Sequence, residues 1–417
     1  MATFAAGLRT PFARYWLSGF LADFGDGVRL AAFPLLAAQL TRSPAAVAAV
    51  TAVQGLPWLL LGAGLGVVVD RTDRRRLMVA VDVARAVVIV ALAAAILAHG
   101  AGLWLIYLTA FVTGVGSALR DTAAATCVPR LVQPERLDQA NARLIAGQIV
   151  GNELAGPAAG GALFGLAAVL PFAVNAGTLG IAVLLLLTLP GVFGPPPRES
   201  APGEPGPGEP APGEPAPGRL SVWHDFAEGL RWLWRDRAMR DVTLVAGLIS
   251  ALDAAWFAVL VLYVVRDLHQ QPGAYGLLLA VGALGGVAAG GLGAVLARLG
   301  PWRSLLLGGA AMAASQAGLG LTSNVIVAAV MLLISSGAWA LFNITAVTMR
   351  QRQVPAALLG RVTSLFGTVA RGTEALGALA GGVLAATAGI RAPMLVGAPP
   401  LALAVAVLAW RHRTGRA

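Results

Sequence analysis

Twelve long apolar segments constrain the fold of this chain more than any other feature of its sequence. A helix that crosses a lipid bilayer needs roughly 20 mostly apolar residues. Only 12% of the residues are charged and the mean hydropathy is +0.76, whereas about a quarter of the residues of a soluble domain are charged. We therefore expect an all-α integral membrane protein with twelve transmembrane helices. The predicted spans are residues 13–38, 45–69, 77–98, 102–126, 141–166, 168–190, 239–264, 274–297, 304–322, 325–348, 362–386 and 393–410.

The positions of the basic residues predict the orientation in the membrane. All 30 basic residues are arginine. If both termini are cytoplasmic, 23 arginines lie on the cytoplasmic side and three on the other, with four inside spans. Arginine and lysine accumulate in cytoplasmic loops, so we expect a multi-pass protein of the cell (inner or plasma) membrane with both termini in the cytoplasm. The same asymmetry accounts for the net charge of +10 without a nucleic-acid partner.

The middle of the chain divides it into three parts. Residues 195–218 are so rich in proline and glycine that they predict an extended tether. An amphipathic stretch follows, for which we expect a helix capped by Ser221 and lying in the cytoplasmic interface. Gly19…Asp26 and Gly247…Asp253 occupy similar places in the first and seventh spans, which indicates an internal duplication. We expect two six-helix, pseudo-symmetric bundles at 1–190 and 239–417, joined by a cytoplasmic linker at 191–238.

The connection between the second and third spans carries a charged motif. It reads Gly66-Val-Val-Val-Asp70-Arg71-Thr-Asp73-Arg74-Arg75-Arg76, which resembles the loop signature of the major facilitator superfamily, although Asp73 stands where that family usually has glycine. An aspartate at this position can meet the positive end of another helix dipole. We expect a charge cluster that holds one conformation closed; the alternative is anchoring by positive charge alone. The predicted gating residues are Gly66, Asp70, Arg71, Arg74, Arg75 and Asp121.

The fifth span carries a glycine-rich motif. The motif residues are Gly151, Gly156, Pro157, Gly160 and Gly161. Their Gly-Pro-x-x-Gly-Gly pattern resembles the signature of exporting antiporters of the same superfamily. Small residues allow helices to approach closely, and proline bends a span.

Two further connections narrow the resemblance. The sequence resembles the branch of siderophore exporters and macrolide-efflux-type proteins at three places. These are Pro129-Arg130…Pro134-Glu135-Arg136, Arg350…Pro355, and Gly25-Asp26 in the first span. An arginine that the family often has in mid span four is replaced here by Ala110.

Charged residues inside the spans are the candidate functional groups, because a charge in mid-bilayer costs about 2.5–3.5 kcal/mol on insertion scales. Glu153 and Asp253 have no basic neighbour in their own spans, so we expect them to bind protons or cations. The other candidates have oppositely charged neighbours at i, i+3 or lie beside such a pair, so they are either coupling groups or static ion pairs. These other candidates for proton coupling or for the substrate cavity are Asp23, Asp26, Arg29, Arg371 and Glu374.

The resemblance implies a secondary active transporter that works by alternating access. We expect proton-coupled export of an amphipathic organic small molecule, such as a drug or a siderophore-like metabolite. The alternatives are a proton-coupled importer, a lysophospholipid or lipid flippase on the same fold, and, from another class, a non-transporting membrane scaffold or sensor. No nucleotide-binding or metal-ligand motif occurs in the sequence, so we expect no enzyme activity, cofactor or metal. The expected partners are the small-molecule substrate, protons and membrane lipid, with the protein acting as a monomer.

Overall fold

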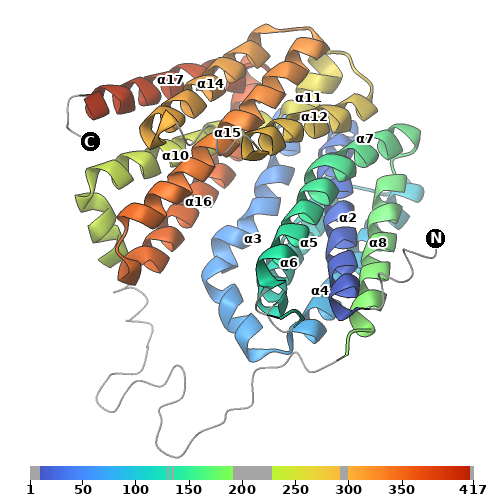
Figure 1. Ribbon diagram of the computed structural model, residues 1–417. Helices are drawn as coiled ribbons and strands as arrows, with labels where there is room; N and C mark the ends of the chain where they lie inside the picture. The colour runs from blue at the N-terminus through green and yellow to red at the C-terminus, as the bar shows by residue number, and fades with distance from the viewer. Residues whose placement is uncertain (1–9, 129–130, 134–135, 191–227, 292–298, 414–417) are drawn as a thin grey trace, which may run out of the picture.

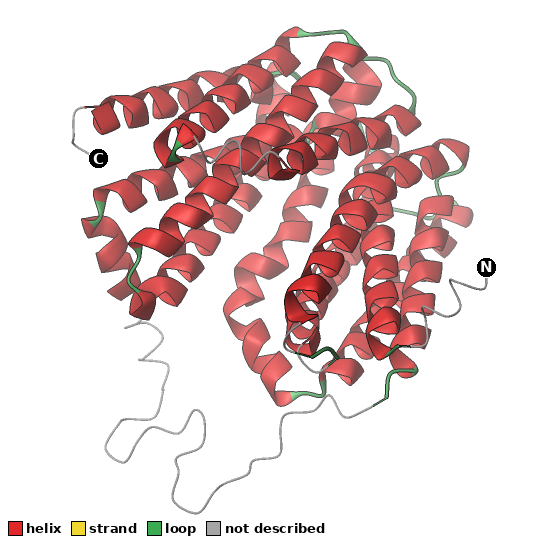
Figure 2. Cartoon of the chain, viewed as in Figure 1, coloured by secondary structure: helices red, strands yellow, loops and turns green. Residues whose placement is uncertain are grey.

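The computed structural model describes residues 10–128, 131–133, 136–190, 228–291 and 299–413. This part of the chain consists of helices joined by short loops, and Figure 2 shows no strand in it. The helices before residue 190 are α2 (Pro11–Leu40), α3 (Pro44–Arg71), α4 (Arg74–Leu97), α5 (Leu103–Cys127), α6 (Leu137–Gln148), the π-helix η3 (Ile149–Ala155), α7 (Gly156–Leu166) and α8 (Leu170–Leu187). The later ones are a helical segment at 228–235, α10 (Arg237–Phe257), α11 (Leu260–Leu262), the π-helix η4 (Tyr263–Asp267), α12 (Pro272–Gly291), α14 (Pro301–Leu321), α15 (Val325–Gln353), α16 (Ala356–Ala388) and α17 (Ala392–Arg413).

Local sequence explains where several helices begin. The Thr10 hydroxyl accepts a hydrogen bond from the Ala13 amide at 3.2 Å, ahead of a proline in the first turn of α2. Asp73 caps α4 in the same way, with Oδ1 accepting from the Arg76 amide at 2.9 Å. The backbone of Asp73 is extended, at φ −68° and ψ 115°. The turn after α3 therefore needs no glycine at this position, and the aspartate supplies a helix cap instead.

Eight helices of the described part are long and apolar enough to cross a membrane. They coincide with eight of the predicted spans. The other four predicted spans fall on α2, α3, α16 and the consecutive run of α6, η3 and α7. Charged residues in the central turns of α2 and α16 lower the hydropathy of those two helices. The chain is thus a multi-pass membrane protein.

Two sets of helices meet at one end of the molecule. We call the helices before residue 190 the first set and those after residue 228 the second set. Figure 1 shows α14, α15 and α17 of the second set grouped on one side and α2, α6 and α8 of the first set on the other. Two apolar clusters join the two sets at this end. Phe33 of α2 packs in the same core as Val261 of α11, and Ala48 of α3 packs in another core with Ala254 of α10. Toward the opposite end the described residues form separate clusters, one around Met78 of α4 and one around Met239 of α10 and Leu408 of α17. The two sets of helices therefore share a core at only one end.

Close backbone contacts tighten this shared end. A Cβ added to Gly276 of α12 would overlap the carbonyl oxygen of Pro157 in α7, and one added to Gly161 would lie 2.8 Å from the Gly276 amide nitrogen. A Cβ added to Gly382 of α16 would lie 2.6 Å from the Ala48 side chain in α3. Only glycine lets these helices approach so closely. The α7–α12 and α3–α16 pairs are therefore the seams along which the two sets are joined.

An arginine clasp completes the closed end. Arg266 in η4 donates hydrogen bonds to the carbonyl oxygens of Thr41 and Arg42, each at 3.0 Å, and to that of Ala38 at 3.5 Å. These carbonyls lie at the C-terminus of α2, where the last turn of a helix leaves its carbonyls unsatisfied and the helix dipole favours a cation. Arg266 therefore links the second set of helices to the first through the end of α2.

Candidate functional site

A cavity of about 570 Å³ lies between the two sets of helices, roughly midway along them. Four of the charged residues predicted from the sequence line it: Glu153, Asp253, Arg371 and Glu374. They come from η3, α10 and α16, so the chain brings together groups that lie more than 200 positions apart in sequence. Trp339 of α15 also lines this cavity, and its side chain is 45% exposed.

A second cavity region of about 610 Å³ adjoins the first. It shares Glu153, Asp253 and Trp339 with the first, and then runs along α12 and α15. Its further lining is largely apolar or small, and includes Leu278, Leu279, Gly282, Ala283, Gly286 and Val287. We refer to the two regions as the charged arm and the apolar arm of the central cavity.

Glu153 lies in the cavity because of a local change in helix type. Residues Ile149–Ala155 form a π-helix between α6 and α7. Pro157 lacks the amide that would bond the Glu153 carbonyl in an α-helix, and the Gly156 amide bonds instead to the Gly151 carbonyl, five residues back. π-Helical turns are frequent at functional sites. The glycine–proline pair thus produces a wider turn rather than a simple bend, and the exposed Glu153 side chain lies on it.

Asp253 and Glu374 lie near one another because α10 and α16 pack closely. A Cβ at Gly377 would overlap the Ala251 carbonyl, and one at Gly381 would overlap that of Ala255. Asp253 is within electrostatic range of Glu374, which is in turn within range of Arg371. The Trp256 indole donates a hydrogen bond to Asp253 Oδ1 at 3.1 Å. The charged arm therefore holds two neighbouring carboxyl groups, one of them oriented by a tryptophan.

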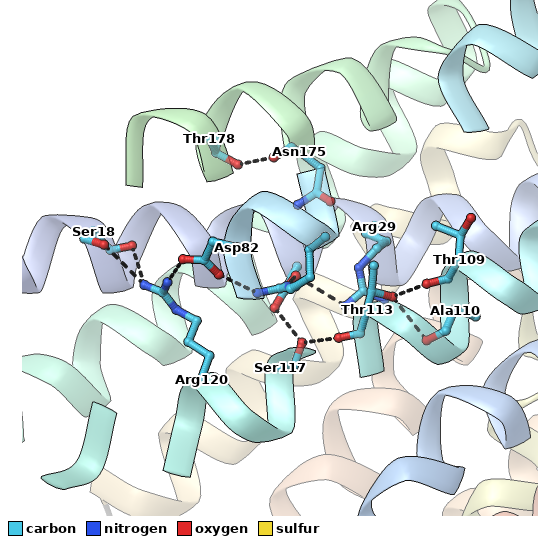
Figure 3. A network of polar contacts seen from close by, with 12 residues as sticks. Ser18, Arg29, Asp82, Thr109, Ala110, Thr113, Ser117, Arg120, Asn175 and Thr178 are labelled. Atoms are coloured by element: carbon cyan, nitrogen blue, oxygen red, sulfur yellow. Dashed lines mark hydrogen bonds and ion pairs between the residues drawn. The ribbon is translucent and has the colours of Figure 1, made fainter. Parts of the chain in front are cut away.

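A buried ion-pair network lies beside the cavity, within the first set of helices (Figure 3). Asp26 of α2 accepts from Arg29 at 3.3 Å, from Ser117 of α5 at 3.2 Å, and from Arg85 of α4. Asp82 of α4 accepts from Arg85 at 3.2 Å and pairs with Arg120 of α5.

The network connects three helices and continues to the backbone of α2. Arg120 also donates to the carbonyl oxygen of Ser18 at 3.0 Å. The side chains of Asp82 and Arg85 are fully buried. Asp26 and Arg29 are thus not an isolated i, i+3 pair, because Arg85 shares the same carboxylate oxygen of Asp26.

Asp23 and Asp121 lie at the edge of this network. Asp23 is within electrostatic range of Asp26, Asp121 and Arg120. Asp121 is exposed and within range of Arg120 and of Arg371. Asp121 therefore lies between the buried network and the arginine of α16 that lines the cavity.

The predicted gating loop is partly described. Arg75 donates to the carbonyl oxygens of Leu189 and Leu187, at 2.7 and 2.9 Å, and so caps the end of α8. Arg74 is buried at the start of α4. The side chains of Gly66, Asp70 and Arg71 lie outside the described residues. The gating cluster that we expect around Asp70 remains a prediction.

The glycines of the fifth span face two neighbours at once. A Cβ at Gly156 would lie 2.7 Å from Gly27 Cα, one at Gly160 would overlap the Val28 carbonyl, and one at Gly151 would lie 3.1 Å from the Phe24 amide nitrogen. These contacts are all with α2. Gly161, in contrast, faces α12 across the seam between the two sets of helices. The motif thus allows one helix to pack tightly against both.

Four residues of the network were not among the candidates from the sequence: Asp82, Arg85, Ser117 and Arg120. The i, i+3 spacing of Asp82 and Arg85, and the charge of Arg120 inside the fourth predicted span, were the available signals. Their partners on other helices depend on packing and are not visible in sequence spacing. In the part of the chain that the structure describes, no group of three or more His, Cys, Asp and Glu side chains is placed to hold a metal ion.

Comparison with known proteins decides the family. The sequence matches the Major Facilitator Superfamily over residues 15–373. The chain belongs to the major facilitator superfamily. It is a transporter, not an enzyme, and its fold implies small-molecule substrates. No curated protein matches the sequence.

Solved structures of transporters share the fold over nearly the whole chain. A bacterial homologue of the iron transporter ferroportin, in an inward-facing state, has a TM-score of 0.74 at 17% identity, covering 96% of this chain and 98% of its own. The nucleoside transporter NupG has a TM-score of 0.72 at 13% identity, covering 96% and 99%. A bacterial homologue of the human lysosomal transporter Spinster, inward-facing and unoccupied, has a TM-score of 0.68 at 17% identity, covering 98% and 97%. At these identities the likeness shows the fold alone.

Proposed function

We propose that this facilitator-superfamily protein is a proton-coupled exporter of an amphipathic organic small molecule. One observation carries the proposal: carboxyl groups from both sets of helices line a single cavity midway along the molecule, and the sets share a core at one end only. A cavity closed at one end and lined by protonatable groups is what alternating access with proton exchange requires. The glycine–proline signature that resembles exporting antiporters supports outward transport.

Alternating access would move the two sets of helices about this cavity. In the present state, the α7–α12 and α3–α16 seams and the Arg266 clasp close the end that lies opposite the arginine-rich loops. We assign that closed end to the outside of the cell and the present state as inward-facing, the state in which the ferroportin and Spinster homologues were solved. Export would require these seams to open and the opposite ends of the bundles to approach.

The same proposal covers the finer points of organisation. We assign residues 1–190 and 239–417 to two six-helix bundles, with both termini and the 191–238 linker in the cytoplasm and the protein in the inner or plasma membrane as a monomer. The separate cores around Met78 and Met239 support this division. Within the superfamily, we assign the chain to the branch of siderophore exporters and macrolide-efflux-type proteins on the loop motifs of its sequence.

Coupling needs a carboxyl that holds a proton in one state and releases it in another. Glu153 and Asp253 are the better candidates, because both are reachable from the cavity. The Asp26 carboxylate already accepts hydrogen bonds from two arginines and a serine. Asp26 could therefore bind a proton only if the buried network rearranged. We propose that Glu153 and Asp253 exchange protons with water, and that Asp26 links this exchange to the motion by releasing and regaining its arginines. Loss of the carboxylate at either Glu153 or Asp26 should therefore uncouple transport from protons.

Proteoliposomes test the function without knowledge of the natural substrate. Purified protein is reconstituted with a panel of cationic, neutral and anionic fluorescent compounds inside or outside the vesicles, with and without an imposed pH gradient. Export against inward protons predicts that the gradient accelerates movement of at least one compound opposite to the proton flow. Acceleration in the same direction as the protons would indicate an importer instead. Movement of no compound in either direction would favour a scaffold or sensor.

A lipid flippase is the second candidate, and the apolar arm favours it. That arm runs along α12 and α15 between small and apolar side chains, from Leu278 to Val287, and has a volume of about 610 Å³. Fluorescent lysophospholipid placed in the outer leaflet and quenched by dithionite reports on flipping directly. Protein-dependent movement of the lipid, without movement of the soluble panel, would select the flippase.

A further inference from the structure

We propose that the central cavity binds an organic cation with a bulky apolar body, whose positive charge lies between Asp253 and Glu374 and whose body lies in the apolar arm. The inference rests on the proposed transport function and adds the chemical class of its substrate. It follows from the charge, shape and aromatic lining of the cavity.

The first argument is charge. The described lining of the charged arm holds three carboxyl groups, those of Glu153, Asp253 and Glu374, against one guanidinium, that of Arg371. Asp253 and Glu374 are close enough to repel one another when both are ionised. A cation between them removes that repulsion, whereas an anion would add to it. The charged arm therefore selects positive ligands.

The second argument is shape. The apolar arm adds about 610 Å³ of largely apolar space beside the same two groups, Glu153 and Asp253. Ligand sites for organic molecules combine a mostly apolar pocket with a few polar groups that fix orientation. An inorganic cation would leave this space unused, and the described residues offer no set of ligands for a metal ion. The ligand is therefore an organic molecule that is charged at one end.

The third argument is aromatic lining. Trp339 lines both arms and is 45% exposed, so part of this aromatic residue is accessible where the arms join. Phe257 lines both arms as well. Tryptophan attracts organic cations electrostatically through its ring face. Trp256, by contrast, is buried and donates its N–H to Asp253, so it orients the carboxylate rather than the ligand.

The guanidinium groups near the cavity do not favour an anion. Arg29 is 6% exposed and engaged with Asp26, and Arg85 is fully buried in the same network. Arg371 is within electrostatic range of Glu374, so a carboxylate already balances it. We infer that Arg371 lowers the affinity of the carboxyl pair for cations, which allows the substrate to dissociate.

Two probes of nearly equal shape and opposite charge test the inference. Tetraphenylphosphonium and tetraphenylborate are titrated into the purified full-length protein in detergent, and binding is measured by equilibrium dialysis against protein-free detergent. We expect the phosphonium to bind and the borate to bind at least about tenfold more weakly. Asp253→Asn with Glu374→Gln should weaken phosphonium binding by about tenfold or more, and Trp339→Leu by about fivefold. Glu228→Gln, outside the cavity, is the matched control and should bind as the wild type does.

One variant separates loss of binding from loss of folding. Arg371→Gln removes the one positive charge in the described lining of the charged arm, so it should bind the phosphonium several-fold more tightly, a gain that misfolding cannot produce. Equal binding of both probes, or unchanged affinity in the double variant, would overturn the inference. The assay uses no gradient, so phosphonium binding without proton-driven transport would refute only the coupling. If the protein exports a compound in response to the pH gradient but binds the phosphonium more weakly than the borate, only the substrate class is refuted.

Discussion

The arginine clasp at the closed end gives the sharpest conformational prediction. Arg266 donates two hydrogen bonds of 3.0 Å to carbonyl oxygens at the end of α2, and a longer third one. Arg266→Ala removes these bonds, and the small side chain cannot replace them. The carbonyls are partly exposed, so water can satisfy them once the clasp is lost. The substitution should therefore leave the protein folded and change only the balance between conformations.

The size of the effect follows from the number of bonds. Each of the two short bonds contributes about 1–1.5 kcal/mol net, which is below the range of about 1.5–3 kcal/mol for charged groups because the site is partly wet. The closed end should then be destabilised by about 2–3 kcal/mol relative to the open one. Since 1.4 kcal/mol corresponds to a tenfold change, the equilibrium should shift by about 30- to 150-fold. Arg266→Lys keeps the charge near the helix end but not the fork of donors, so its shift should be smaller.

Distances between spin labels on the two sets of helices measure this shift. Gln39 of α2 and Gln271, which precedes α12, are both exposed and can be changed to cysteine in a Cys127→Ala background. Pulsed electron paramagnetic resonance should show a longer distance gaining population in Arg266→Ala. Arg303→Ala, an exposed arginine at the start of α14, is the matched control and should leave the distribution unchanged. Identical distributions in the wild type and Arg266→Ala would refute the clasp.

Four further predictions address the seam, the network, the gate and the topology. Gly276→Leu should abolish transport by blocking the close contact of α7 with α12, whereas Gly180→Leu in α8, where an added Cβ meets nothing within 4 Å, should not; vesicle assays with both variants decide this. Arg85→Ala leaves two buried carboxylates short of a partner and should lower stability by about 3–5 kcal/mol, measured by thermal unfolding in detergent; a melting curve like that of the wild type would contradict the network. Asp70→Asn should impair transport while the protein still inserts in the membrane, and unimpaired transport would argue against gating there. Reporters fused at Gly203 and at the C-terminus should both read cytoplasmic, and an external signal from either would refute the orientation.

Sequence patterns predicted the superfamily and singled out the four charged residues that the described lining of the charged arm contains. Periodic apolar segments gave the spans, because lipid requires long helices regardless of how they pack. A charge inside a membrane span is costly and is usually retained for a function or an ion pair. This identified Glu153, Asp253, Arg371 and Glu374. That these four lie in one cavity follows only from the packing of η3, α10 and α16.

Packing between helices explains what the sequence did not reveal. Asp26 and Arg29 were recognisable as an i, i+3 pair, but Arg85 lies on another helix and joins them only because α2 and α4 fold together with α5. The glycine–proline pair was expected to bend the fifth span, and the structure shows that it widens the helix into a π-turn. The helix expected after the linker is described only at 228–235, where Glu228 pairs with Arg361 of α16. Contacts of this kind depend on side chains that are distant in sequence, so spacing alone could not predict them.

Proton-driven efflux in carboxyl variants tests the central claim most directly. Vesicles containing the wild type, Glu153→Gln, Asp26→Asn or the Glu228→Gln control are loaded with a transported compound, and efflux is followed with and without an imposed pH gradient. The account predicts that Glu153→Gln and Asp26→Asn keep downhill efflux but lose the component driven by the gradient, while Glu228→Gln keeps both. A gradient-driven component that persists unchanged in Glu153→Gln and Asp26→Asn would show that these carboxyls do not couple transport to protons.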